Sequence, residues 1–473
     1  MNEKYYIKFK DNDIPKYIQI YQYFKKNIDR GIINEGDKLP TIRQLSKDLA
    51  VNKITIINAY NRLEEEGYLY QKMGSGTYAR RKNSLKMIKK QYSETFKNLN
   101  RQKLKNYIDF TGETISNSFF PVDIFRKILN DVLKRDGIDA LTYQDFLGFE
   151  GLRKSIIRYF WQSRFKKDDV LIVSGAQQGI DIIAKGLINN NDNIVVEKPT
   201  YSGALAVFNW KKTNIFEIEV EPDGMNLESL EYLLRKKKIR FIYLMTYFQN
   251  PTTVTYGIDK KLKLLELAQK YEFYIIEDDY LSELIYDESI EYRSLKSLDR
   301  YDKVIYIKSF SKLFLPGIRL GYVIVPDKFK ESIENAKINS DISTSSLMQR
   351  ALELYLNTGH WVKHMEFLKS EYNLRYNYMK KQLYEKLNDF IEFCEPGGGL
   401  NFFIKLKENV NISSMELFQK CKANKVLITP GGLFYKDYTE GNKFFRISFS
   451  QTDNESISTG ITVIYNILSQ SIK

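Results

Sequence analysis

The chain has 473 residues, of which 43% are apolar and 28% charged, a composition typical of globular proteins and a length sufficient for two or three domains. Two cysteines, Cys394 and Cys421, exclude a disulfide framework or a thiolate metal cluster. The sequence has no signal-peptide layout or long apolar run, so we expect a cytoplasmic protein without membrane segments. The net charge of +13 is concentrated at the front, where residues 1–105 hold 23 Lys and Arg against 11 Asp and Glu, a balance that suits a polyanionic partner.

Three amphipathic helices are predicted within the basic front end. Apolar residues recur at helical spacing over residues 14–29, and the pattern stops at Gly31. After a glycine turn, Thr41 and Gln44 have the spacing of a capping box that opens a short second helix. A third helix follows a brief break and ends before Gly67. The inward-facing residues are Tyr17, Ile20, Tyr21, Phe24 and Ile28, then Ile42, Leu45 and Leu49, and finally Ile56, Tyr60 and Leu63.

The second and third helices have the arrangement of a helix-turn-helix. In that motif the second helix enters the major groove of DNA by its N-terminal end. The following run, YLYQKMGSGTYARR, predicts two short strands around a Gly-Ser-Gly turn at residues 74–76. A hairpin directly after a recognition helix is a wing, which is suited to contact the adjacent DNA backbone or minor groove.

Residues 14–78, including GDKLPTIRQL, VNKITIINAYNRLEEEGYL and GSGTY, resemble the winged helix-turn-helix of the GntR family of bacterial transcription regulators. The resemblance implies contact with double-stranded operator DNA. The recognition helix begins with Asn52-Lys53, where the family usually has Ser-Arg. Lysine is a point charge whereas arginine is a bidentate fork, so phosphate contact gains weight over base readout. The residues implied to contact DNA are Arg43, Asn52, Lys53, Thr55, Lys72, Ser75 and Gly76, although a solvated surface position is the alternative for each one taken singly.

The domain boundaries follow from these patterns. We place the DNA-binding domain at residues 12–80 and a linker at residues 81–106. The linker is basic and polar and has no sustained apolar stripe. It is expected to be an exposed, partly helical connector with some affinity for the DNA backbone, or simply a spacer. A second domain then covers residues 107–473.

Short apolar strands alternate with helical patterns in this second domain, for example DVLIVSG before GIDIIAKGLIN. The alternation predicts an α/β fold with a mostly parallel central sheet and helices on both faces. Ligands of such sheets bind at the carboxyl ends of the strands. The residues that follow the predicted strands are Ser174, Gly175, Ala176, Gln177, Tyr201, Asn250, Asp278, Tyr280, Ser309, Ser311 and Lys312.

These strand-end residues have the chemistry that pyridoxal 5'-phosphate (PLP) requires. A helix N-terminus with hydroxyls and Arg319 suits the phosphate. A carboxylate can pair with a protonated ring nitrogen while an aromatic side chain stacks on the ring, and Asn together with Tyr can hold a phenolate oxygen. The amine of Lys312 can form a Schiff base with the aldehyde. Because a lone lysine is more often structural, the prediction depends on the whole set.

Residues 107–473 resemble the fold-type I, aspartate aminotransferase-like PLP enzymes. Matching pieces are LTYQDFLGFEGLRKSI, SGAQQG, EKPTYSGAL, YFQNPTT, IEDDY, SFSKLFLPGIRLGY, PGGGLNFF and FRISFS. Together with the GntR-like front end, the chain resembles the MocR-type subfamily of GntR regulators. The resemblance therefore implies a winged helix-turn-helix joined to a fold-type I PLP-dependent transferase domain, assembled as a homodimer.

The resemblance also implies a role for each matched residue. Lys312 forms the internal aldimine, and Asp278 pairs with the ring nitrogen. Asp279 remains an alternative, although Asp278 lies two residues from Tyr280, which puts both on one side of an extended chain. Tyr280 and Asn250 hold the ring oxygen, and Tyr201 stacks on the ring. Tyr143 reaches the phosphate of the neighbouring subunit's cofactor, and Arg446 binds the α-carboxylate of an amino acid. The residues that grip the phosphate are Ala176, Gln177, Ser309, Ser311 and Arg319.

Some features depart from these patterns or carry no site. Thr253 stands where the family often has a turn glycine, so an altered loop is expected. No second basic residue accompanies Tyr201, so nothing indicates a second carboxylate clamp. His360 and His364 have a metal-compatible spacing without a recognised acidic third ligand, and we interpret them as surface histidines. The PGGG run at residues 396–399 predicts a turn rather than a phosphate loop.

The leading hypothesis is a cytoplasmic, homodimeric transcription regulator that holds PLP and senses an amino acid or another amine through aldimine chemistry at Lys312. The alternative is a catalytically active PLP-dependent aminotransferase that carries a DNA-binding head, because all the cofactor-holding residues are present. A DNA-binding protein with a purely structural rear domain fits less well for the same reason. The sequence leaves the effector, the operator and the sign of regulation open.

Overall fold

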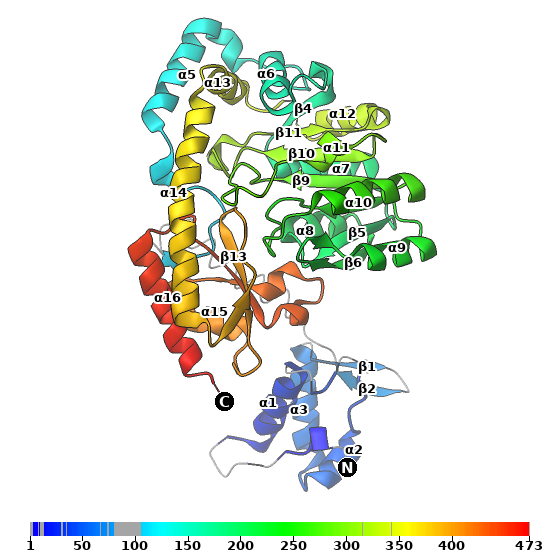
Figure 1. Cartoon of the computed structure of the whole chain (residues 1–473). Coiled ribbons are helices and arrows are strands. Elements are labelled where there is room, and N and C mark those ends of the chain that lie inside the picture. The colour runs from blue at the N-terminus through cyan, green and yellow to red at the C-terminus, as the bar shows by residue number, and fades with distance from the viewer. Residues whose placement is uncertain are drawn as a thin grey trace. The chain divides into compact units, whose positions relative to one another are not determined.

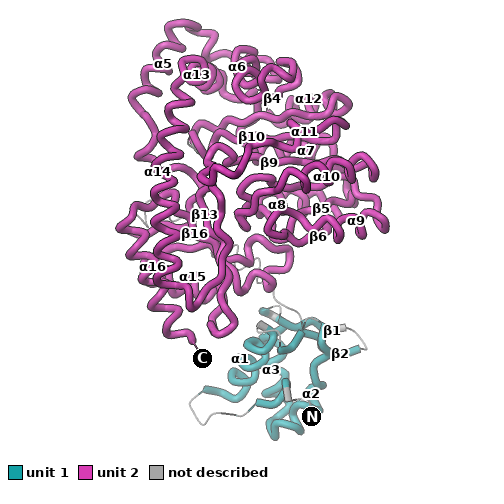
Figure 2. Tube along the Cα trace, in the orientation of Figure 1, with its two compact units in different colours: residues 1–101 teal, residues 102–473 magenta. Residues whose placement is uncertain are grey.

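The computed structural model describes residues 3–7, 9, 14–29, 32–34, 36–66, 68–72, 75–79, 106–314, 316–341 and 343–472. The chain divides into two compact units, residues 1–101 and residues 102–473 (Figure 2). Apart from its last residue, the predicted linker lies outside the described residues, as do the predicted helix ends at Gly31 and Gly67. Among the described helices, none is long and apolar enough to cross a membrane.

The N-terminal unit contains the three predicted helices and the predicted hairpin. The apolar stripes of the helices meet in one core, in which Ile20, Phe24, Ile56 and Leu63 are fully buried. The two strands of the hairpin pair in antiparallel fashion. The elements are α1 (Lys16–Asp29), α2 (Ile42–Asp48), α3 (Lys53–Glu65), β1 (Leu69–Lys72) and β2 (Gly76–Ala79). Amphipathic spacing thus predicted these three helices correctly, and the Gly-Ser-Gly turn predicted the hairpin; a short 3-10 helix, Glu3–Tyr5, was not predicted.

Polar side chains begin α2 and α3. Thr41 Oγ1 accepts a hydrogen bond from the Gln44 amide at 3.2 Å, and Asn52 Oδ1 accepts one from the Ile54 amide at 3.0 Å. The predicted capping box is only half formed, because the Gln44 side chain donates to Asp48 Oδ1 at 2.8 Å instead of returning to Thr41. Each cap satisfies an amide that has no partner within its own helix.

An eight-stranded sheet forms the centre of the C-terminal unit, in the order β4-β11-β10-β9-β8-β5-β6-β7 (Figure 1). Neighbouring strands from β10 to β6 are parallel, whereas β11 is antiparallel to both its neighbours and β7 is antiparallel to β6. The mostly parallel sheet is therefore confirmed. The strands are β4 (Val170–Val173), β5 (Asn193–Lys198), β6 (Asn214–Glu221), β7 (Gly224–Met225), β8 (Phe241–Leu244), β9 (Tyr274–Asp279), β10 (Val304–Ser309) and β11 (Gly321–Ile324).

Helices cover both faces of this sheet. On β8, Ile242 and Leu244 join an apolar cluster with α9 and α10, whereas Tyr243 between them packs edge-on against Phe208 of α8. On the same face as α8, α7 contacts β10 and β11, and α12 packs against α7. The helices are α7 (Ala176–Leu187), α8 (Ser202–Trp210), α9 (Leu227–Lys236), α10 (Ile258–Tyr271), α11 (Leu295–Leu298) and α12 (Lys330–Ile338). Burial on both faces explains why strands such as β4 and β8 are continuously apolar.

A smaller antiparallel sheet, in the order β12-β13-β16-β15, completes the C-terminal unit. In Figure 1, α14 and α16 lie side by side next to this sheet. The first strand of the unit, β3 (Ile108–Asp109), pairs in parallel with β14 (Val426–Leu427), which brings the start of the unit beside its last segments. The remaining elements are α5 (Val122–Asp136), α6 (Glu150–Trp161), α13 (Ser346–Asn357), α14 (His360–Gln382), β12 (Ile391–Phe393), β13 (Asn401–Leu406), α15 (Ser414–Ala423), β15 (Thr429–Pro430), β16 (Phe444–Ser448) and α16 (Asn454–Ser469).

One histidine of the pair on α14 does not have the predicted surface position. His364 is buried among the rings of Phe120, Phe314 and Tyr355, and burial lowers its pKa to about 4. It shares the inner face of α14 with the buried Leu368, one turn further along. The helix therefore uses His364 as a packing residue.

Candidate functional site

The carboxyl ends of β4 and β10 meet a helix start and an arginine. Gly175 follows β4 with a φ of +87° and caps the N-terminus of α7. Arg319 Nη2 donates to the carbonyl oxygen of Ser174 at 2.6 Å. A Cβ added to Gly175 would lie 3.3 Å from both Arg319 Nη2 and the Ser311 hydroxyl, so these residues surround one small space. The buried Ser311 hydroxyl has no hydrogen-bond partner in the described part of the chain. This corner has the donors of a phosphate site.

Other predicted phosphate contacts lie around the same corner. Ser309 is the last residue of β10, and its hydroxyl accepts from the Ser311 amide at 3.3 Å. Ala176 and Gln177 form the first turn of α7. Tyr201, which precedes α8, donates through its hydroxyl to Gln177 Oε1 at 3.2 Å. Burial raises the pKa of Tyr201, and the negative charges of Glu113 and Asp278 add to the effect, which indicates that these groups share one environment.

Asp278 and Asp279, at the end of β9, have opposite surroundings. Asp279 receives hydrogen bonds from Tyr292 and Tyr306 at 2.7 Å and an ion pair from Lys308 at 3.0 Å. Asp278 Oδ2 accepts from the Tyr243 hydroxyl at 2.7 Å, whereas its buried Oδ1 has no partner among the described residues.

The pKa values of the two acids diverge accordingly. Burial raises the pKa of Asp278 to about 6, against the hydrogen bond from Tyr243. Burial also opposes the charge on Asp279, but Lys308 and the two tyrosines outweigh it and hold the pKa below its ordinary value. Of these two acids, Asp278 is the one that keeps a carboxylate oxygen available for a ligand.

Lys312 belongs to an ion-pair network centred on Glu113, which the sequence did not indicate. Its Nζ donates to Glu113 Oε2 at 2.7 Å, and Glu113 Oε1 contacts Arg446 Nη1. Asn250 joins the network, since its Nδ2 donates to Glu113 Oε1 at 3.1 Å and its Oδ1 accepts from Arg446 at 2.7 Å. Burial works against the charge of Glu113, but Arg446 and Lys312 outweigh it and hold its pKa well below the ordinary range. Burial raises the pKa of Tyr280 and the nearby charge of Glu113 adds to the effect, but the Tyr280 hydroxyl donates to the Phe248 carbonyl at 2.6 Å.

Glu113 is the main residue that sequence reasoning missed. It precedes Lys312 by 199 positions and Arg446 by 333 positions. It also lies outside the strand-end pattern that located the other residues, in the segment that follows β3. The only signal was an isolated acid in the small polar run FTGETIS.

The loop after Asn250 retains a conformation typical of glycine. Thr253 has a φ of +65°, in the left-handed region, and its amide donates to the Gln249 carbonyl at 2.6 Å. A β-branched residue is strained in this region. The expected alteration of the loop thus takes the form of local strain.

Tyr143 stands apart from the residues above. It follows a short 3-10 helix, Gly137–Leu141, and its side chain is 77% exposed. No hydrogen bond or ion pair in the described chain joins it to Lys312 or Arg319.

The predicted DNA contacts lie on α2, α3 and the hairpin. Arg43 and Lys53 are exposed, whereas Asn52 uses its side-chain oxygen to cap α3. The adjacent Ile54 is 62% exposed, an apolar group at the head of the recognition helix that the sequence pattern did not single out. Thr55 lies half-buried in the first turn, Ser75 and Gly76 are exposed in the hairpin, and Lys72 ends β1.

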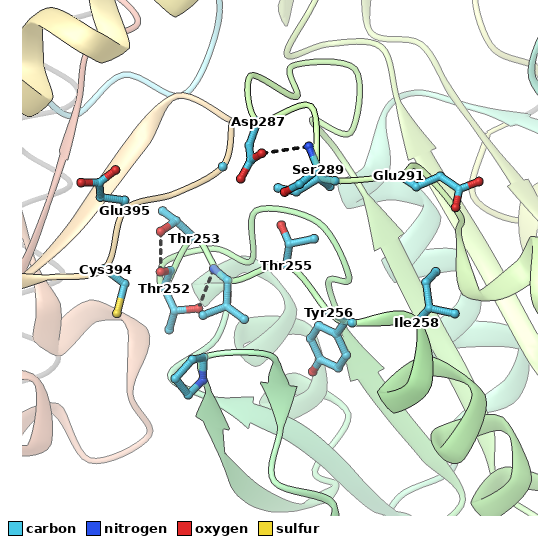
Figure 3. Close-up of a pocket in the computed structure, with 15 residues that line it drawn as sticks. Thr252, Thr253, Thr255, Tyr256, Ile258, Asp287, Ser289, Glu291, Cys394 and Glu395 are labelled. Atoms are coloured by element: carbon cyan, nitrogen blue, oxygen red, sulfur yellow. Dashed lines mark hydrogen bonds between the residues drawn. The ribbon is translucent and has the colours of Figure 1, made fainter.

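A cavity of about 460 Å³ lies on the loop that contains Thr253 (Figure 3). Thr252, Thr253 and Tyr256 line it together with the acidic side chains of Asp287, Glu291 and Glu395. None of the predicted cofactor residues lines this cavity, and none of its lining residues is basic. Its carboxylates would repel a phosphate and no lining cation offsets them, so the chemistry of the strand ends lies elsewhere.

Comparisons with known proteins agree with this division. The profile of the family described as aminotransferase class I and II matches residues 116–464, and the profile of the bacterial regulatory proteins of the gntR family matches residues 16–79. Aromatic-amino-acid aminotransferase 1 of Thermococcus litoralis is 31% identical over 77% of this chain and 89% of its own length. The uncharacterized HTH-type transcriptional regulator YdfD of Bacillus subtilis is 26% identical over 95% of both chains.

A solved structure shares the fold of the C-terminal unit. The α-aminoadipate aminotransferase LysN of Thermus thermophilus, complexed with N-(5'-phosphopyridoxyl)-L-leucine, superposes with a TM-score of 0.73 and 26% identity. The match covers 78% of this chain and 94% of that one.

Proposed function

Since the chain belongs to the aminotransferase class I and II family and begins with a gntR-type DNA-binding domain, we propose that it is a PLP-dependent transcription regulator that responds to an amino compound. One observation carries the proposal: a carboxylate oxygen, a hydroxyl, a helix start, an arginine and Lys312 converge at strand ends and leave polar atoms unsatisfied. The same chain carries an exposed recognition helix. The proposed domains are residues 12–80 and 107–473, joined by a linker at residues 81–106.

The side chains fit PLP. The unpartnered Asp278 Oδ1 could accept from a ring nitrogen, and the unpartnered Ser311 hydroxyl, beside Arg319 and Gly175, could donate to a phosphate. When bound, PLP supplies an aldehyde that condenses reversibly with primary amines. The residues proposed to hold it are Lys312 at the aldehyde, Asn250 and Tyr280 at the ring oxygen, Tyr201 on the ring face, and Ala176, Gln177, Ser309, Ser311 and Arg319 at the phosphate.

The chain's own groups set the protonation states in this site. A pKa of about 6 for Asp278 reflects burial without a cationic partner, so a protonated ring nitrogen beside it would restore the carboxylate. Glu113 keeps its charge because it bridges Lys312 and Arg446. An amine that engages Lys312 therefore changes the surroundings of Glu113, four residues after β3, where the C-terminal unit joins the linker. This is a route by which ligand binding could alter DNA binding.

A homodimer is part of the proposal. Ile138, Leu141 and Tyr143 are 71%, 63% and 77% exposed within six consecutive residues. Apolar groups gathered in this way suit a subunit interface. In the proposed dimer Tyr143 reaches the partner's cofactor phosphate, and two DNA-binding units match two half-sites. We also propose a cytoplasmic location, where chromosomal DNA would be accessible to the recognition helix.

Purified full-length protein tests the cofactor and the DNA activity together. We expect the visible absorption of bound PLP, its loss in Lys312→Ala, and a change in operator affinity when an amine is added. Genome-wide mapping of binding sites would supply the operator. Lys53→Ala, at the head of α3, is expected to weaken operator binding by roughly 1–3 kcal/mol, whereas Lys26→Ala on the exposed side of α1 should not.

Two results would contradict the proposal. If Lys312→Ala retains the same absorption, the cofactor assignment is wrong. If operator affinity is unchanged by every amine while an oxo acid is released over many turnovers, the chain is an aminotransferase with a DNA-binding head.

A further inference from the structure

Arg446, the residue expected to receive a ligand's α-carboxylate, already holds a carboxylate of its own chain. Glu113 Oε1 contacts Arg446 Nη1, and Asn250 Oδ1 accepts from the same nitrogen at 2.7 Å. Arg446 is 2% exposed, and its Nη2 donates to the Thr111 carbonyl at 3.4 Å. The charge that would attract an amino acid's carboxylate is thus neutralised from within the protein.

The backbone that carries Glu113 is fixed on both sides. The Ile115 amide donates to the Lys312 carbonyl at 3.0 Å, and Gln451 Nε2 donates to the carbonyls of Thr114 at 2.8 Å and Ile115 at 2.9 Å. On the other side, a Cβ added to Gly112 would lie 2.7 Å from Gln451 Cγ, so the chain runs directly against that residue. A ligand could therefore free Arg446 only by turning the Glu113 side chain away.

Such a displacement is unfavourable. The Glu113 carboxylate is tethered beside Arg446, so a ligand carboxylate competes with a group at high effective concentration. Once displaced, the Glu113 carboxylate would lose both of its cationic partners, Lys312 and Arg446, which is costly for a side chain that is only 20% exposed. An amine without a carboxylate avoids both costs. It leaves the pair with Arg446 intact, and its nitrogen arrives beside Lys312, where Glu113 Oε2 accepts hydrogen bonds.

We propose that Glu113 is a specificity-determining residue that directs this site to primary amines without an α-carboxylate. The inference rests on the proposed amine-responsive function and names its ligand class. Glu113 acts in two ways: it occupies the arginine that an amino acid would need, and it supplies a negative charge beside the incoming ammonium group.

Matched pairs of ligands that differ only in the α-carboxylate test this inference. Full-length PLP-loaded protein is titrated with isoamylamine and L-leucine, phenethylamine and L-phenylalanine, and putrescine and L-ornithine, and the change in cofactor absorption gives each Kd. For each pair of which at least one member alters the absorption, wild-type protein should bind the amine more tightly than its parent amino acid. Glu113→Gln should shift the ratio of the two Kd values toward the amino acid by about tenfold or more, because a charged hydrogen-bond partner of Arg446 is replaced by a neutral one.

Two further variants complete the test. Glu113→Asp keeps the charge and should keep the wild-type preference. It can be measured even if Glu113→Gln folds poorly. Glu395→Gln makes the same substitution at a partly exposed acid that pairs with Lys380, and it should leave the ratio unchanged. Equal ratios in wild type and Glu113→Gln, or a wild-type preference for the amino acids, would overturn the proposed role of Glu113 and leave the proposed amine response intact. If neither member of any pair alters the absorption, the proposed amine response fails and this inference fails with it.

Discussion

Adjacent side chains of identical chemistry can have unrelated tasks, as Asp278 and Asp279 demonstrate. They alternate across β9, so each meets a different set of neighbours. Asp279 is saturated by Lys308 and by tyrosine hydroxyls, whereas Asp278 has one oxygen without a partner in the described chain. Asp279 therefore stabilises the fold, and Asp278 is available to a ligand.

Asparagine substitutions separate these tasks. Asp278→Asn should leave the protein folded and weaken PLP binding by roughly 10- to 100-fold, since a charge-assisted hydrogen bond contributes about 1.5–3 kcal/mol. Asp279→Asn should lower the free energy of unfolding by about 3–5 kcal/mol, because it takes one carboxylate from the buried Lys308. Cofactor titration and denaturant unfolding measure the two effects. Loss of PLP binding by a fully stable Asp279→Asn variant would contradict the assignment.

Asp278 should also make the cofactor-free protein sensitive to pH. Its pKa is about 6 in the folded protein against 3.8 for the ordinary carboxyl, so between about pH 4 and 6 the folded state binds the extra proton. Stability from this group is therefore present at low pH and lost as the pH rises through 6, by about 3 kcal/mol in total. The difference in free energy of unfolding between wild type and Asp278→Asn should fall over that range. A constant difference would show that Asp278 does not titrate there.

Local sequence patterns could predict some residues of the candidate site and not others. Lys312, Asp278 and Ser311 were predicted because each lies at or just after the carboxyl end of a strand, and parallel strands bring their carboxyl ends to one edge. The choice of Asp278 over Asp279 followed from alternation relative to Tyr280. Glu113 obeys no such periodicity, because the pairing of β3 with β14 determines its position. Long-range pairing of short strands leaves no local signal in the sequence.

At the scale of elements, the loop from Gln249 to Gly257 connects the sheet to the site and stores strain. Thr253 adopts a φ of +65° although it is β-branched, and it is buried. Its hydroxyl donates to the Thr252 carbonyl at 2.6 Å, which offsets part of the cost. The sequence flagged the missing glycine correctly, but a pattern of residue types could not show that the backbone would keep the glycine conformation.

A glycine at position 253 should relieve this strain. A left-handed conformation costs a non-glycine residue about 1–2 kcal/mol, and glycine loses about 0.5–1 kcal/mol through its greater freedom in the unfolded chain. Thr253→Gly should therefore be up to about 1 kcal/mol more stable than Thr253→Ala, since both variants lose the hydroxyl and only glycine relieves the strained backbone. Thr253→Ala keeps the strained backbone and loses the hydroxyl, so it should be less stable than wild type. Denaturant unfolding measures both, and a Thr253→Gly variant no more stable than Thr253→Ala would contradict the strain argument.

At the scale of the whole molecule, the exposed residues Ile138, Leu141 and Tyr143 would connect the site to assembly in the proposed dimer. A regulator with one recognition helix per chain contacts a two-fold operator with high affinity only as a dimer. Burial of this apolar segment in the dimer would bring Tyr143 to the partner's site, so PLP binding and DNA binding would both depend on the same interface.

A charge in this segment should therefore dissociate the dimer and weaken operator binding. Ile138→Glu would bury an unpaired carboxylate at the interface, which is strongly unfavourable. Tyr232→Glu, at a 63% exposed position on α9, is the matched control and should remain a dimer. Sedimentation equilibrium gives the oligomeric state, and fluorescence anisotropy gives the affinity for one and for two half-sites. Ile138→Glu should lose affinity for the two-half-site operator and keep its affinity for a single half-site, because the recognition helix itself is unchanged. A dimeric Ile138→Glu variant would place the interface elsewhere on the C-terminal unit.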